Sequence, residues 1–135
     1  SREFASDYYE EIGLGIDFTA RDLQAKLKEK GLPWERAKGF DGSAMIGQFV
    51  HKQTLGDLEN LNFSLKKNQE IVQKGNTADM LWKIDALIEY ISKYFTLKIG
   101  DIIFTGTPSG VGPVTHGDQL VGFVKNQEFF SVKVK

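Results

Sequence analysis

The sequence predicts a single, strand-dominated α+β domain with a few peripheral helices. Three observations lead to this fold class. Short apolar runs alternate with polar residues at the period of a strand, turn residues separate these runs, and two stretches repeat apolar residues at helical spacing. The chain has 135 residues, enough for one hydrophobic core, and it contains no internal repeat or interdomain linker. We therefore expect one domain over residues 1–135.

The first expected elements are a strand and the helix that follows it. Residues 11–18 alternate apolar with small or polar side chains, which predicts a strand. Residues 22–30 carry two leucines at i, i+4 and end at a glycine followed by a proline, which predicts a short helix. Residues 34–51 are rich in glycine and aperiodic, so we expect a long functional loop with short strand pieces.

In the second half of the chain, helix caps and turn residues mark the ends of the elements more clearly. Thr77 can cap a helix whose apolar residues recur at helical spacing as far as Phe95. Residues 105–113 are rich in glycine and proline and predict a loop. The expected strands are residues 61–65, 70–73, a buried strand at 102–104, and a closing pair at 119–124 and 128–134.

Composition excludes several classes of function. The 17 Lys and Arg residues are balanced by 18 Asp and Glu residues, and the net charge of −1 provides no positive field for nucleic acid or an anionic membrane. No apolar run approaches the roughly 20 residues that span a bilayer. The chain has no cysteine, so disulfides and thiolate metal sites are excluded. We expect a cytoplasmic protein.

A first chemically promising segment, residues 15–24, lies at a strand-to-helix junction. Asp17, at the end of the strand, has the oxygen ligands that a hard cation prefers. Arg21 and Gln24 can share one face of the first helical turn, where they could bind a substrate carboxylate and orient a carbonyl. The alternative is a structural ion pair between Asp17 and Arg21, with Gln24 merely exposed.

A second segment, residues 36–42, places Lys38 beside Gly39. A glycine lets a ligand approach closely, and the lysine ammonium could then stabilise the charge of an enolate. The alternative is a solvated lysine in an ordinary glycine-rich loop, and the pattern by itself favours that alternative.

A third segment, residues 105–112, combines glycines with hydroxyl groups. Backbone N–H groups and hydroxyls in such a loop can bind a carboxylate or phosphate oxygen. The segment lacks the Gly-Lys-Ser/Thr of a nucleotide-binding loop and the glycine spacing of a dinucleotide fingerprint. A tight structural turn is an equally good interpretation.

Other candidates are expected in structural roles. His51 and His116 lie in polar, turn-like surroundings, where we expect them to be solvated. Phe129 and Phe130 are expected in the core or at an oligomer contact rather than in a ligand cage.

Four segments, in one order, resemble the fumarylacetoacetate hydrolase family. One such motif is modestly specific, but four in sequence over almost the whole chain are specific together. The spacing resembles that of the short, acylpyruvase-like and oxaloacetate decarboxylase-type members. The matching segments are Gly-Ile-Asp-Phe-Thr-Ala-Arg-Asp-Leu-Gln at residues 15–24, Arg-Ala-Lys-Gly-Phe-Asp at 36–41, Gly-Asn-Thr-Ala-Asp-Met at 75–80, and Gly-Asp-Ile-Ile-Phe-Thr-Gly-Thr-Pro-Ser-Gly-Val-Gly at 100–112.

The resemblance assigns roles to the candidate residues. It implies the mixed β-roll of that family, a homodimer, and Mg²⁺ or Mn²⁺ as cofactor. It also implies that residues 1–135 are the C-terminal catalytic and substrate-binding portion of one family domain. By the resemblance, Asp17 is a metal ligand, Lys38 is the catalytic lysine, and the substrate-binding residues are Arg21, Gln24, Gly39 and Thr107.

The sequence departs from the family in its metal ligands. The family's Glu-x-Glu pair and its water-activating His and Glu precede the aspartate strand, and no Glu-x-Glu occurs in this chain. A cation held by Asp17 alone would be bound weakly. We expect either that an N-terminal segment precedes these residues or that the protein is truncated and cannot perform the chemistry.

The implied activity is metal-dependent cleavage of a C–C bond in a small 2-oxo or β-diketo acid. Acylpyruvate hydrolysis and oxaloacetate decarboxylation both leave negative charge that a metal and Lys38 could hold as an enolate. One alternative is a 2-oxo acid hydratase or tautomerase of the same family. The other is an inactive fragment that binds carboxylates or only oligomerises. We expect no nucleic-acid or membrane partner.

Overall fold

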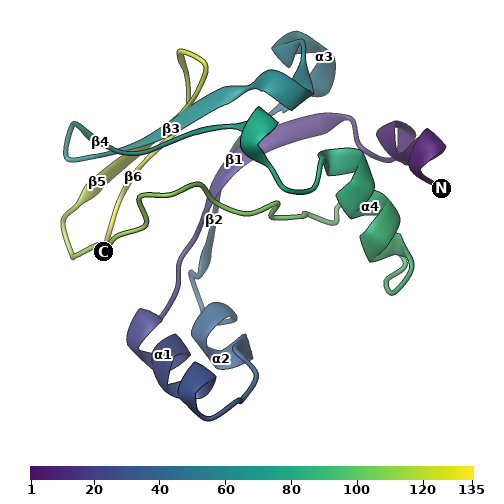
Figure 1. Cartoon of the computed structure of the whole chain (residues 1–135). Coiled ribbons are helices and arrows are strands. Elements are labelled where there is room, and N and C mark those ends of the chain that lie inside the picture. Colours follow the sequence, from purple (N-terminus) through teal and green to yellow (C-terminus); the bar gives the residue numbers. More distant parts are fainter.

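The computed structural model describes all 135 residues and confirms the α+β fold class. Strands hold 30% of the residues and helices 29%. Figure 1 shows the elements, with α1 and α2 standing apart from the strands. The strands are β1 (Glu11–Asp17), β2 (Ala44–His51), β3 (Asn62–Lys67), β4 (Glu70–Asn76), β5 (Gln119–Val124) and β6 (Gln127–Lys133). The α-helices are α1 (Arg21–Glu29), α2 (Glu35–Lys38), α3 (Lys52–Leu55) and α4 (Ile84–Ser92); 3₁₀ turns cover Arg2–Tyr8, Leu58–Asn60 and Thr77–Asp79.

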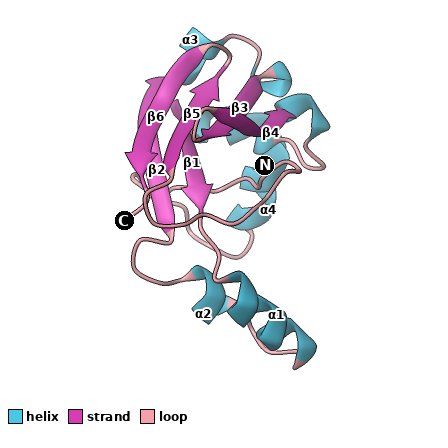
Figure 2. Cartoon of the chain, turned by 90° about the vertical axis from the view of Figure 1, so that its left-hand side faces the viewer, coloured by secondary structure: helices cyan, strands magenta, loops and turns pink.

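The strands form two antiparallel sheets. One has four strands in the order β4-β3-β5-β6, and the other is the pair β1-β2. The pair lies against β5 and β6, as Figure 2 shows. Two glycines allow this close approach: a Cβ at Gly47 of β2 would lie 2.7 Å from the carbonyl oxygen of Phe129 on β6, and one at Gly122 of β5 would lie 2.8 Å from Leu14 Cδ2 on β1.

The core lies between the two sheets. Leu120 is the most buried large side chain, with 1% of its surface exposed, and Phe129 and Phe130 are buried beside it, which confirms their expected core position. Apolar side chains of β1 and β2 cover this cluster from the opposite side. Burial of apolar surface is the main favourable contribution to folding, so the stability of the domain is concentrated here.

Most of the predicted strands form with small shifts at their ends. The β3–β4 hairpin turns at Asn68 and Gln69, whose φ angles of 51° and 77° are those of a tight hairpin turn. The closing pair β5–β6 also forms as predicted. Helix α1 confirms the first predicted helix. None of the helices combines the length and the apolar character that a membrane-spanning helix needs.

Two predictions for the connecting segments were wrong. Residues 34–51 are not a long loop: they form α2 and the eight-residue strand β2, because β1 needs an antiparallel partner and β2 supplies it. Thr77 does not cap a long helix. Its hydroxyl accepts a hydrogen bond from the backbone N–H of Leu61 at 2.8 Å, Asn76 caps a short 3₁₀ turn, and α4 begins only at Ile84.

The predicted buried strand at residues 102–104 was also wrong. The segment is irregular, and Ile102 and Phe104 are 48% and 44% exposed, because no strand of either sheet pairs with it. The whole chain exposes 9731 Å². A compact monomer of this mass exposes ~7,100 Å² by the usual surface-to-mass scaling. Large apolar side chains are among the exposed residues, Leu81 and Ile99 most of all, so the two sheets alone do not enclose all of the chain's apolar surface.

Tyr9, just after the N-terminal turn, forms a hydrogen bond with α4. The Tyr9 hydroxyl donates to Asp85 Oδ1 at 3.2 Å, and the Lys52 ammonium lies 4.6 Å from the centre of the tyrosine ring. Partial burial of the hydroxyl, followed by the negative charge of Asp85 and the hydrogen bond to it, raises the pKa of Tyr9 to about 12. Asp85 therefore has a structural role and does not simply face solvent.

Candidate functional site

The candidate catalytic residues lie where a helical excursion leaves the β1–β2 pair. This α1–α2 excursion, residues 18–43, projects from one end of the molecule (Figures 1 and 2). Two backbone bonds close its base: Phe18 N–H donates to Ser43 O at 2.7 Å, and Ala20 N–H donates to Ala37 O at 3.0 Å. Ala37 is completely buried at this junction. The base of the excursion is therefore fixed to the sheet although its helices are exposed.

Lys38 is the centre of the first group of candidate residues. Its ammonium lies 2.7 Å from Asp17 Oδ2 and donates to Thr19 Oγ1, also at 2.7 Å. A lysine ammonium has three N–H donors, so one remains for a ligand. The pair is partly open to solvent, with 36% of the lysine side chain and 49% of the aspartate side chain exposed. Asp17 Oδ1 makes no hydrogen bond and is available as a ligand oxygen.

The local structure of Lys38 differs from the sequence prediction. Lys38 is the last residue of α2 rather than part of an extended glycine-rich loop. Gly39 follows as the end of that helix, and its N–H donates to Glu35 O at 2.6 Å. The alternative ion pair between Asp17 and Arg21 does not form. Lys38, at the end of α2, forms the ion pair with Asp17 instead.

Arg21 and Gln24 form a second group on α1, as their spacing predicted. Arg21 Nη1 donates to Gln24 Oε1 at 2.8 Å, and Gln24 is 9% exposed rather than solvated. They border an open hollow of about 330 Å³. The rest of its lining is Ala25, Lys28 and Trp34, so two cationic side chains and an indole surround the space. Such a lining suits a small anion.

Thr107 is not in hydrogen-bond contact with either group. It lies in the Thr107 loop (residues 105–113), where its hydroxyl oxygen accepts a hydrogen bond from Gln73 Nε2 of β4 at 3.0 Å. The loop begins close to the site strand: a Cβ at Gly15 of β1 would lie 3.0 Å from the ring of Phe104. The loop therefore runs from β1, which carries Asp17, to the outer strand β4.

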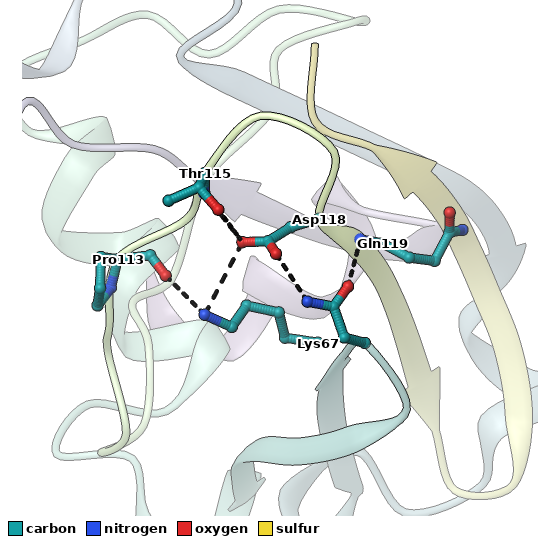
Figure 3. A network of polar contacts seen from close by, with 6 residues as sticks. Lys67, Pro113, Thr115, Asp118 and Gln119 are labelled. Carbon is teal, nitrogen blue, oxygen red and sulfur yellow. Dashed lines mark hydrogen bonds and ion pairs between the residues drawn. The ribbon is translucent and has the colours of Figure 1, made fainter.

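Lys67 binds the far end of the Thr107 loop, and the buried carboxylate of Asp118 holds both Lys67 and the chain just after the loop, as Figure 3 shows. Asp118 Oδ2 accepts from Thr115 N at 2.8 Å, and Oδ1 accepts from Asn68 Nδ2 at 2.7 Å. Lys67 Nζ lies 3.8 Å from Asp118 Oδ2 and donates to Pro113 O at 3.1 Å. The hydrogen bonds from Thr115 and Asn68, more than the lysine, hold the pKa of Asp118 below its usual range.

The residues present fit a divalent cation only as part of a ligand set. Asp17 offers one free carboxylate oxygen, which is the kind of ligand that Mg²⁺ and Mn²⁺ prefer. Nowhere in the structure do three His, Cys, Asp or Glu side chains gather closely enough to hold a metal. Asp17 by itself could supply only one carboxylate oxygen to such a cation, and its role as a metal ligand stays a prediction.

Two polar contacts of the site were missed by sequence reasoning. Thr19, which binds Lys38, lies two residues after Asp17, so its position in the same motif could have indicated it. Gln73, which binds Thr107, gave no such indication, because it lies on a strand 34 positions earlier in the chain. Its role becomes visible only when the loop is seen lying on β4.

Comparison with known proteins identifies the family to which this fold belongs. The family model described as fumarylacetoacetate (FAA) hydrolase C-terminal matches residues 1–134. The chain belongs to this family.

Two curated relatives carry the name oxaloacetate tautomerase. Oxaloacetate tautomerase YcgM from Escherichia coli K12 is 50% identical over 109 residues, covering 80% of this chain and 50% of its own length. The mitochondrial oxaloacetate tautomerase FAHD1 from Homo sapiens is 43% identical over 131 residues, covering 97% of this chain and 59% of its own. The chain thus spans about half of the length of the curated relatives that it matches.

A solved structure extends the likeness to the fold. The fumarylpyruvate hydrolase from Pseudomonas aeruginosa, in complex with Mn²⁺ and pyruvate, superimposes with a TM-score of 0.92 at 35% identity. The match covers 99% of this chain and 57% of that one. The relative therefore combines this fold with a divalent metal and a 2-oxo acid.

Proposed function

We propose that this chain is the 2-oxo-acid-binding part of an oxaloacetate-type keto–enol tautomerase. The observation that carries the proposal is the Lys38 ammonium, held by Asp17 and Thr19 with one N–H donor unused. The names of relatives up to 50% identical support this reaction over others of the family. The tautomerase, an alternative interpretation of the sequence, thus becomes the leading one.

The chemistry makes a specific demand that Lys38 meets. In the conversion of a 2-oxo acid to its enol, a base takes a proton from C3 and the C3–H electron pair forms the C2–C3 double bond. The π pair of the carbonyl moves to the C2 oxygen, which is then protonated. Negative charge grows on that oxygen, and a fixed ammonium donating to it stabilises the charge more than it stabilises the neutral ketone. The hydrogen bonds to Asp17 and Thr19 fix the ammonium before the substrate arrives.

The remaining candidate residues are proposed to bind and orient the acid. Arg21 presents a guanidinium fork to a carboxylate, and the bond to Gln24 restricts its orientation. Asp17 Oδ1, with ligands from outside these residues, would hold Mg²⁺ or Mn²⁺, and Gly39 and Thr107 would border the substrate. Such a cation, when bound, supplies Lewis-acid polarisation of the carboxylate and 2-oxo oxygens.

Hydrolytic C–C cleavage is the second candidate, because a fumarylpyruvate hydrolase matches 99% of the chain. Attack of water on a distal carbonyl breaks the C–C bond and leaves the electron pair on the pyruvate part as an enolate. Lys38 would stabilise that enolate in the same way. The two reactions therefore share the site described here and differ in whether a water is activated.

Product analysis of the complete polypeptide with Mg²⁺ separates these reactions. The tautomerase predicts faster loss of the ultraviolet absorbance of enol oxaloacetate, with no pyruvate formed above the uncatalysed rate. Pyruvate released from acylpyruvates, measured with a coupled dehydrogenase, would establish the hydrolase instead. Absence of both activities, with no calorimetric binding of oxalate and Mg²⁺, would overturn the proposal in favour of an inactive protein. Sedimentation of the same sample tests the proposed homodimer.

A further inference from the structure

The Thr107 loop lies directly on the edge strand β4. Three contacts show how closely the loop lies on the strand. A Cβ at Gly75 would lie 3.0 Å from Pro108 Cβ, and a Cβ at Gly110 would collide with the carbonyl oxygen of Val72. Between these two contacts, Gln73 forms hydrogen bonds to the loop. Gly110 also has φ +96°, a conformation that favours glycine. Substituting either glycine would lift the loop from the strand, so β4 determines its position.

Gln73 makes two bonds from one nitrogen. Its Nε2 lies 3.0 Å from Thr107 Oγ1 and 3.1 Å from the carbonyl oxygen of Pro108. A carbonyl oxygen can only accept, so the atom facing it must be the NH₂ group of the amide, and both of its hydrogens are used. The orientation of the Gln73 amide is thereby fixed by its partners.

This geometry also fixes the role of the Thr107 hydroxyl. A hydroxyl has a single proton and can accept at its lone pairs. Because Gln73 donates to Thr107 Oγ1, the threonine proton is not consumed by that contact and stays available to another acceptor. Thr107 is exposed, so the acceptor can come from outside the protein.

We propose that Gln73 is a positioning residue that makes Thr107 a hydrogen-bond donor to a carboxylate oxygen of the substrate. The inference rests on the proposed function for the identity of that anion. The inference goes beyond the proposed function because it assigns a role to Gln73, a residue of β4 that touches no reacting atom. Gln73 fixes the rotamer of Thr107. Because Gln73 donates to the threonine hydroxyl, that hydroxyl does not donate to β4.

The test replaces Gln73 in the complete polypeptide with methionine, which has similar length but no polar group, and with glutamate, which can only accept when ionised. The matched control is Gln119→Met on β5, because Gln119 Nε2 also donates to a hydroxyl of the same sheet, that of Ser131, at 2.6 Å. We expect Gln73→Met to raise KM for the 2-oxo acid about tenfold at nearly constant kcat, as loss of uniform binding requires. Gln73→Glu should raise KM further, and Gln119→Met should leave KM within about twofold.

A double-mutant cycle distinguishes positioning from a general structural effect. In a Thr107→Val background, Gln73→Met should change KM by no more than about twofold, since the two residues act through one hydroxyl. If the two effects instead multiply, or if Gln73→Met leaves KM unchanged, the inference is wrong.

A second readout does not depend on turnover. The ¹³C shift of the Thr107 methyl group reports its rotamer, and we expect it to move in Gln73→Met and not in Gln119→Met. If the wild-type protein converts no 2-oxo acid, the proposed function fails, and the methyl shift still decides the positioning role. An unmoved methyl shift in both Gln73 variants would overturn that role even in an active enzyme.

Discussion

The four-stranded sheet and the α1–α2 excursion differ in what holds them together. The sheet encloses Leu120, Phe129 and Phe130, each at most 8% exposed. The excursion buries only Gln24, Leu27 and Ala37, and it is joined to β1 by a partly exposed ion pair between Lys38 and Asp17. Exposed ion pairs contribute little to stability, whereas buried apolar side chains contribute several kcal/mol. Stability and the proposed chemistry are therefore located in different parts of the molecule.

Because stability is concentrated in the sheet, we expect the largest loss of stability when a cavity is made in its core. Leu120→Ala should lower the free energy of unfolding by about 2.7–5 kcal/mol, because the leucine is 99% buried. Chemical denaturation followed by circular dichroism measures the change. Leu81→Ala is the matched control, since Leu81 is 98% exposed and its loss should change the free energy by no more than about 0.5 kcal/mol. Equal losses in the two variants would contradict the assignment of the core.

The converse prediction concerns Lys38. Lys38→Ala should lower kcat by about 10²–10³-fold, the effect of removing one donor to a developing oxyanion. The melting temperature should change little, because the lysine is partly exposed and its ion pair is screened by water. Lys26→Ala, on the exposed side of α1, should leave both quantities unchanged. Full activity in Lys38→Ala would remove the lysine from the mechanism.

The same comparison explains how much of the fold the sequence could predict. The hairpin β3–β4 and the pair β5–β6 were predictable, because their alternation and turn residues are local. β2 was missed because its pairing with β1 joins residues that are up to 40 positions apart, Glu11 and His51, across a helical excursion. The apolar run at residues 102–104 has the composition of a buried strand but has no partner strand here.

The candidate site was predictable to a smaller extent. The Arg21–Gln24 contact follows from helical spacing alone and is confirmed. Asp17 and Lys38 are 21 positions apart, and only a family resemblance associated them before the structure placed their charged atoms 2.7 Å apart. The bond between Gln73 and Thr107 depends on a loop crossing a strand edge, which no local pattern encodes.

Asp118 provides the smallest predicted effect and tests the connection between the two regions. It belongs to the sheet, yet with Lys67 it fastens the end of the Thr107 loop. Asp118→Asn should lower the melting temperature at neutral pH by a few degrees, since the ionised carboxylate accepts from Thr115 and Asn68.

The pH dependence of this effect has a defined sign. The pKa of Asp118 is lowered in the folded state, so the native carboxylate releases its proton more readily than the unfolded one. Its contribution to stability is present above the ordinary value of 3.8 and is lost as the pH falls below it, through the folded pKa. The difference in melting temperature between wild type and Asp118→Asn should therefore be constant from neutral pH to about pH 5 and shrink at lower pH. A difference that persists unchanged to pH 2 would show that the asparagine disturbs packing rather than removing a charge. Thr107 methyl shifts in the same variant would then show whether the disturbance reaches the loop.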